Sequence, residues 1–183
     1  PFMFNIGLIN STQARSIHLA IAVFLAFLAF PALKKSPRHY IPIMDWILAL
    51  GGAFCAAYIF IFYIELSERP GLPTQMDVVV SAAGICFVLE ATRRALGMPL
   101  MIIGIVFMCY VFFGHLAPEI ISWKGASFNK AMSHFYLTTE GVYGVALGVS
   151  TSMVFMFVLF GSLLEKAGAG NYFIRVAFAL MGH

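Results

Sequence analysis

Long apolar runs separated by short polar segments make up most of this chain. An α-helix of about 20 apolar residues crosses the roughly 30 Å hydrocarbon core of a bilayer. The predicted spans are residues 16–33, 43–64, 77–92, 99–116 and 142–164, and a further, incomplete apolar stretch begins at Tyr172. Residues 77–92 are short for a span, so we expect neighbouring helices or a locally thinner membrane to accommodate their ends. The pattern predicts an all-α integral membrane protein, a bundle of about five transmembrane helices.

Acidic side chains lie at or near the ends of the predicted spans. This placement is expected because a charge at the centre of a bilayer costs about 2.5–3.5 kcal/mol. The eight acidic residues are Asp45, Glu65, Glu68, Asp77, Glu90, Glu119, Glu140 and Glu165. The sequence therefore contains no chain of intramembrane carboxylates that could relay protons.

Basic residues give the orientation of the spans. Lys34, Lys35 and Arg38 lie between the first two spans, and Arg93 and Arg94 lie between the third and fourth. Loops rich in Lys and Arg stay on the cytoplasmic side of a membrane. We therefore expect the first and third loops to be cytoplasmic and the loop between them to face outward.

Turn residues mark where the spans begin and end. The prolines between residues 31 and 42 predict a break between the first two helices. Thr74 can cap a helix that has Asp77 in its first turn. Gly97, followed by Met98 and Pro99, predicts a tight turn between two antiparallel helices.

Composition excludes several classes of protein. The chain is 61% hydrophobic and 10% charged, whereas about a quarter of the residues of soluble domains are charged. Its net charge of +3 is small and its basic residues are dispersed, so nucleic acid is not expected as a partner. The spacings of His, Cys, Asp and Glu match no metal site, and no nucleophile elbow or phosphate loop is present. We expect no catalytic residue, no bound metal and no cofactor.

Three charged residues share one helix face at the end of the third span. Glu90 lies three residues before Arg93 and four before Arg94, and cations at a helix C-terminus also suit the helix dipole. One interpretation is an anchor whose long side chains reach the membrane interface. The other is a docking or hinge contact with a neighbouring helix.

Small residues recur at every fourth position in two spans. Ala49, Ala53 and Ala57 follow this spacing in the second span, and Gly144 and Gly148 follow it in the fifth. Such a stripe favours close contact between helices.

The segment from Gly148 to Ser152 allows a second interpretation. Its glycine and hydroxyl residues are typical of a weakened helix that bends or lines a cavity. Ser150 and Thr151 are therefore the candidate ligands for a solute, although the sequence does not identify a binding site.

The connector at residues 117–141 has the pattern of an amphipathic helix. Its apolar positions Phe128, Met132, Phe135 and Tyr136 fall on one helical face. We predict an interfacial helix there, with Trp123 as a membrane anchor, and an irregular connector is the alternative.

Both ends of the chain look cut. The sequence opens at Pro1, has no signal peptide, and stops at His183 within an apolar stretch. We expect the first ten residues to be the tail of a preceding helix.

Several fragments, in order, resemble one family, the fused membrane subunits of TRAP transporters, in particular the TAXI type. The similar fragments are RSIHL at 15–19, IPIMDW at 41–46, RPGLPT at 69–74, LEATRR at 89–94, EGVYG at 140–144, FG at 160–161 and GAG at 168–170. The LEATRR fragment followed by Gly97 is the most specific of them. Together they extend over nearly the whole chain.

The resemblance implies a secondary transporter in a bacterial or archaeal cytoplasmic membrane. It would import organic acids with sodium or protons, fed by a periplasmic TAXI-type binding protein. Residues 1–116 resemble the small Q-type portion with a linking helix, residues 117–141 the connector, and residues 142–183 the start of the large M-type portion.

The resemblance also implies a supporting role for these residues. In that family, hairpins with Gly-Ser-rich tips in the M-type portion build the solute and cation sites, and no such tip precedes His183. We therefore expect a scaffold on which the rest of the M-type portion moves.

Two other classes compete with this interpretation. One is a membrane anchor or assembly subunit of an unrelated complex without transport activity. The other is an oligomeric channel, which the lack of a polar stripe along any span disfavours.

Overall fold

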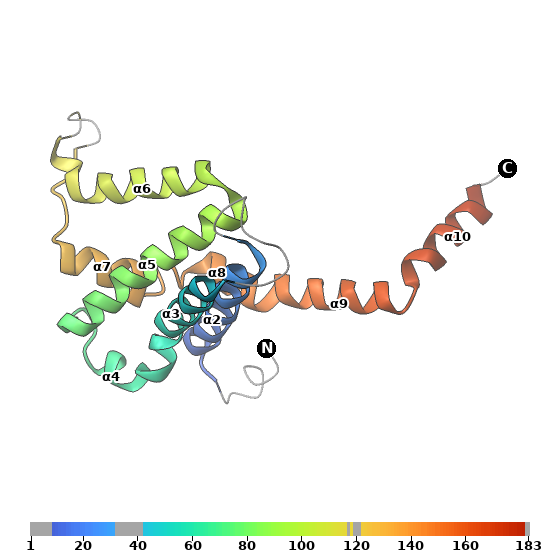
Figure 1. Ribbon diagram of the computed structural model, residues 1–183, viewed down its shortest axis with the longest axis horizontal. Coiled ribbons are helices and arrows are strands. Elements are labelled where there is room, and N and C mark those ends of the chain that lie inside the picture. Colours follow the sequence, from blue (N-terminus) through green and yellow to red (C-terminus); the bar gives the residue numbers. More distant parts are fainter. Residues whose placement is uncertain (1–8, 32–41, 117, 119–121, 182–183) are drawn as a thin grey trace.

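The computed structural model describes residues 9–31, 42–116, 118 and 122–181, and this part of the chain contains helices and no strand. Figure 1 shows α2, α3 and α5 gathered with α8 in a bundle, α6 and α7 beside α5, and α9 with α10 extending away to the right. The predicted all-α class is confirmed.

Four helices among the described residues are long and apolar enough to cross a membrane. They are α2 (Ser11–Ala29), α3 (Ile43–Ile61), α5 (Gln75–Leu96) and the continuous helix Val145–Lys166, which comprises α8 (Val145–Val149), the π-helical turn η2 (Ser150–Val154) and α9 (Phe155–Lys166). Two shorter apolar helices are α6 (Met98–Phe113) and α10 (Ala169–Met181). The predicted span at 99–116 is thus a helix of 16 residues followed by a 3₁₀ turn, η1 (Gly114–Leu116).

The prediction that the third span is short was wrong. α5 has 22 residues, whereas the prediction placed its limits at residues 77 and 92. The helix begins before Asp77 and continues past Arg93 and Arg94 at its end. At its start, Thr74 and Asp77 form a reciprocal capping box. At its end, Gly97 has φ +94°, which turns the chain directly into α6 as predicted.

The first two spans also differ from their predicted limits. α2 begins at Ser11, where Asn10 and Gln13 form a capping box, and it ends at Ala29. α3 ends at Ile61, and a separate short helix, α4 (Tyr63–Glu68), follows Phe62. The predicted break between α2 and α3 lies mostly outside the described residues.

α2 and α3 pack closely through small residues. A Cβ at Gly52 would lie 2.7 Å from Cγ1 of Val23, so only glycine permits this approach. Ala49 and Ala56 are also buried, whereas Ala53 and Ala57 are only partly buried. The buried positions therefore follow the 3.6-residue helical period rather than the strict four-residue spacing of the sequence pattern.

The predicted amphipathic helix is present as α7 (Phe128–Leu137). Its Met132 and Tyr136 are buried together with Val78 and Ile85 of α5, and the rings of Phe128 and Phe112 stack at 6.0 Å. Part of the apolar face of α7 thus packs on protein, while Phe128 is 55% exposed, and the interfacial position of this helix stays a prediction.

Tyr136 makes the closest approach between α7 and α5. Its ring and hydroxyl lie against the backbone of Gly84, in the space where any larger residue would place its Cβ. Tyr136 is fully buried, and this burial raises the pKa of its phenol above the ordinary value. The side chain therefore contacts α5 as a neutral group.

Replacing Gly84 should loosen the contact between α5 and α7. We expect Gly84→Ala to lower the free energy of unfolding by about 1–3 kcal/mol, because the new Cβ displaces Tyr136 from a packed core. Gly161→Ala is the matched control, since nothing lies within 4 Å of the added Cβ and alanine favours a helix. Unfolding in mixed micelles measures both; equal stability of the two variants would contradict this packing.

Candidate functional site

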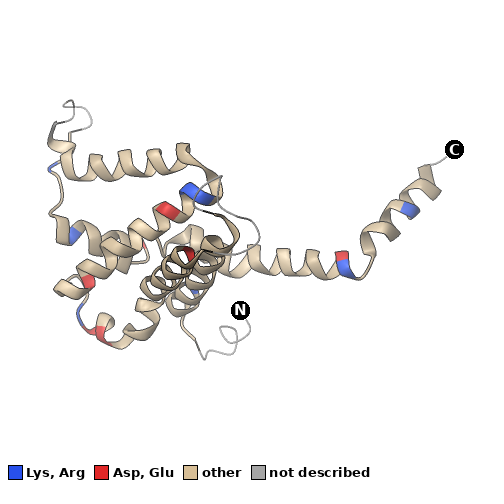
Figure 2. Cartoon of the chain, viewed as in Figure 1, with Lys and Arg blue, Asp and Glu red and all other residues tan. Residues whose placement is uncertain are grey.

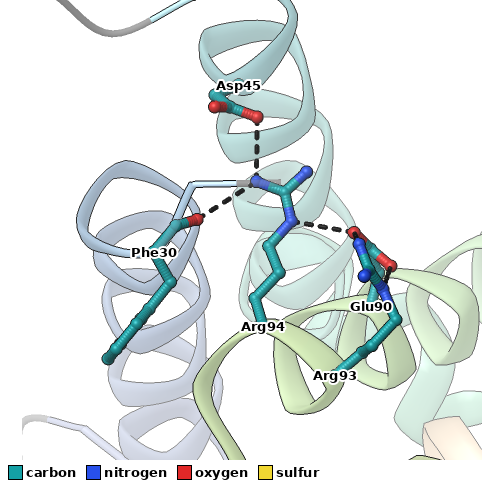
Figure 3. A network of polar contacts seen from close by, with 5 residues as sticks. All are labelled: Phe30, Asp45, Glu90, Arg93 and Arg94. Atoms are coloured by element: carbon teal, nitrogen blue, oxygen red, sulfur yellow. Dashed lines mark hydrogen bonds and ion pairs between the residues drawn. The ribbon is translucent and has the colours of Figure 1, made fainter. Parts of the chain in front are cut away.

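Arg94 connects three helices at one end of the bundle (Figure 3). Its Nη1 donates to Oδ1 of Asp45 in the first turn of α3 at 2.8 Å and to the carbonyl of Phe30, after α2, at 3.4 Å. The side chains of Arg94 and Asp45 are only 2% and 4% exposed. The guanidinium also lies over the ring of Phe27, 4.8 Å from its centroid.

Glu90 completes this buried cluster. Arg93 donates to both carboxylate oxygens of Glu90, at 2.7 and 2.6 Å, and Nε of Arg94 donates to Oε1 at 2.8 Å. The cluster thus contains two guanidinium groups and two carboxylates, counting Asp45, so its formal charges balance. Balance of this kind is what allows charges to leave water.

Asp45 is the member of this cluster that sequence reasoning missed. The sequence grouped Glu90, Arg93 and Arg94 by helical spacing and left an interface anchor and a docking contact as alternatives. The structure shows Arg94 turned toward α3 and α2, with Arg93 more exposed at 31%. The sequence did contain one signal for this contact. Asp45 lies in the first turn of α3, and the start of α3 lies beside the end of its antiparallel neighbour α5.

A second carboxylate is buried at the other end of α5. Asp77 is 1% exposed and accepts hydrogen bonds from the hydroxyl of Tyr58 at 2.6 Å and the amide of Thr74 at 2.8 Å. Nη1 of Arg69 lies 3.8 Å from the same carboxylate. α3 and α5 are therefore joined by a buried acid at each end.

A third polar junction connects α2 to the start of α8. Nη1 of Arg15 donates to the carbonyls of Tyr143 at 2.8 Å and Gly144 at 3.3 Å. Gly148 leaves room for this guanidinium, because a Cβ there would lie 2.7 Å from its Nη2. Gly144 and Gly148, predicted from their spacing to promote close helix contact, thus lie at the junction with α2.

Residues next to Arg15 and at the start of α8 also contact one carbonyl of α3. The hydroxyls of Ser16 and Tyr143 donate to the carbonyl of Ala56 at 2.7 and 2.9 Å. Ser16 and Tyr143 are fully buried. The start of α8 is therefore held against both α2 and α3.

The two candidate solute ligands lie in the π-helical turn η2. Oγ of Ser150 lies 3.2 Å from Nε2 of His18 in α2, and the hydroxyl of Thr151 donates to the carbonyl of Leu147 at 2.7 Å. Their role toward a solute stays a prediction.

Trp123 fastens the connector to the end of α6. Its Nε1 donates to the carbonyl of Val111 at 3.0 Å, and its ring occupies the space beside Gly114. The residue is 44% exposed, so contact with lipid as an anchor stays a prediction.

Charged residues mark helix ends elsewhere in the chain as well. Figure 2 shows an acidic and a basic residue together at the bend between α9 and α10, where Glu165 and Lys166 lie. The described residues contain no group of three or more His, Cys, Asp or Glu side chains that could hold a metal ion.

The apolar helices with charged residues at their ends define a multi-pass α-helical membrane protein. Residues 83–183 match the family described as "Tripartite ATP-independent periplasmic transporter, DctM component". The match extends over more than half of the chain, so the protein belongs to this family and is a membrane permease component of a TRAP transporter. No curated protein and no solved structure matches the chain.

The family assignment decides between the competing classes. It agrees with the resemblance found in the sequence and favours a transporter component over an anchor of an unrelated complex. The matched region begins at residue 83, within α5, and includes α6, α7 and all that follows. The boundaries at residues 116 and 141 and the TAXI type stay predictions.

Breaking the Arg94 contact should destabilise the bundle. Arg94→Gln leaves Asp45 buried without a cation, so we expect the free energy of unfolding to fall by about 3–5 kcal/mol. Arg93→Gln is the matched control, because Arg93 is partly exposed and Glu90 keeps its bond to Arg94. For that exposed pair we expect a loss of about 1 kcal/mol or less.

Unfolding in mixed micelles measures both variants. The double variant Arg94→Met with Asp45→Leu should recover most of the stability, since it removes both charges together. Similar losses in the Arg94 and Arg93 single variants would contradict the assignment of Arg94 as the interhelical contact.

Proposed function

We propose that these residues act mainly as the scaffold of a TRAP permease in the cytoplasmic (inner) membrane of a bacterium or archaeon. The complete transporter would import an organic acid with sodium or protons, and a periplasmic binding protein of the TAXI type would deliver the solute. The scaffold stays fixed while the remaining M-type portion moves. Membrane lipid and that portion are the other partners of this chain.

The buried contact of Arg94 with Asp45 is the observation that carries the scaffold proposal. A moving interface must exchange its contacts at little cost, whereas a buried ion pair loses several kcal/mol when it is opened. The Gly52 contact also joins α3 to α2, and the Asp77 cluster also joins α3 to α5. These features support a rigid group made of α2, α3 and α5.

The distribution of buried residues supports a division of the chain. We assign residues 1–116 to the scaffold, residues 117–141 to a connector and residues 142–183 to the start of the M-type portion. Core residues come mainly from α2, α3, α5 and α7, whereas every described residue of α9 is exposed. The difference supports a boundary between α7 and α9.

The distribution of charge supports an orientation for the scaffold. Arg93 and Arg94 place the end of α5 on the cytoplasmic side by the positive-inside rule. The end with Asp77 and Arg69 then faces the periplasm, where a binding protein would dock.

A transport assay tests the scaffold role. We expect membranes that carry this chain alone to show no uptake of organic acids, because no Gly-Ser-rich hairpin tip is present to build a solute site. Together with the remaining M-type portion and the binding protein, uptake driven by a sodium or proton gradient should appear. Sodium-dependent uptake by the chain alone would overturn the assignment.

A further inference from the structure

The helix Val145–Lys166 changes its hydrogen-bond pattern at one place. In η2 the amide of Phe155 donates to the carbonyl of Ser150, five residues earlier, instead of four. Such a turn holds one residue more than an α-helical turn. The helix is therefore locally wider than a regular α-helix.

Hydroxyl side chains support the carbonyls around this turn. Thr151 donates to the carbonyl of Leu147 at 2.7 Å, and Ser152 donates to that of Gly148 at 2.9 Å. Hydroxyls that bond back to the preceding turn give its carbonyls an additional donor, and they favour bending. The hydroxyls of Thr151 and Ser152 thus add to the departure of this turn from a regular α-helix.

The contacts with the bundle end at the same place. On the N-terminal side, Arg15 holds Tyr143 and Gly144, and His18 contacts Ser150. The ring of His18 also meets the edge of the Phe155 ring at 6.1 Å. From there to Lys166 every described residue is exposed, and α9 extends away from the bundle (Figure 1).

We propose that η2 is a pivot about which α9 and α10 swing relative to α2, α3 and α5. The part of the helix before η2 is held by contacts with α2, the part after Phe155 is exposed, and the turn between them departs from the α-helical hydrogen-bond pattern. His18 is a latch: its contacts with Ser150 and Phe155 hold one position of α9. This pivot does not depend on which portion of the transporter moves during transport.

Distances between spin labels test the pivot in the purified protein in lipid nanodiscs. With the three native cysteines replaced by alanine, labels at Leu50 of α3 and Leu159 of α9 report the position of α9; both sites are exposed. We expect a distance distribution at least twice as wide as that between Ile21 of α2 and Leu50. A distribution as narrow as this reference pair would overturn the proposal.

Two changes act on the pivot in opposite directions. Deletion of Thr151 removes the extra residue of the turn, so the α3–α9 distribution should narrow by at least half. Ser150→Ala and His18→Phe remove the polar latch, and the distribution should widen. Ser162→Ala is the matched control, because its hydroxyl makes the same kind of back-bond, to Val158 at 2.8 Å, in regular helix.

The reference pair shows whether each variant is folded. If the deletion variant unfolds, the two latch variants decide the matter. The role of η2 and its latch would be contradicted if Ser150→Ala and His18→Phe left the width of the α3–α9 distance distribution unchanged. An equal change of this width in Ser162→Ala would contradict it as well.

Discussion

A buried guanidinium must be neutralised where it lies, and the arrangement of this bundle follows from that constraint. Arg94 is almost fully withdrawn from solvent, so its charge is tolerated only beside Asp45 and Glu90. Those two partners come from different helices, and the carbonyl of Phe30 brings in a third. The electrostatic requirement of one side chain thus sets how α2, α3 and α5 meet.

The same constraint operates more weakly in the other two junctions. Asp77 is buried with a tyrosine hydroxyl, a backbone amide and a more distant arginine, and Nη1 of Arg15 donates to two backbone carbonyls. Because acyl chains offer no hydrogen bonds, each of these polar groups must find a partner in protein. Their partners lie on neighbouring helices, which gives the bundle specific contacts that apolar packing between lipid-like surfaces does not supply.

A segment that contacts the bundle and an exposed segment lie next to each other in one continuous helix. Up to Ser150 the helix takes part in polar contacts with α2, and beyond Phe155 its described residues are exposed. The π-helical turn at this boundary joins a stable bundle to a segment that makes few contacts with it. In a transporter family, such a boundary is suited to joining a stationary part to a part that moves.

The sequence by itself determined the helical class, the location of the apolar segments, the Thr74 cap and the turn at Gly97, because each depends on local composition or on residues a few positions apart. It placed the end of α5 at Thr92, since composition cannot show that Arg94 has a partner 49 positions away in Asp45. Only the tertiary structure decided that α7 packs on α5, that Arg15 meets Gly144 and that the helix after Gly144 contains a π-helical turn. These features depend on which helix faces lie together, and that choice is made by burial and charge pairing across the whole bundle rather than along the chain.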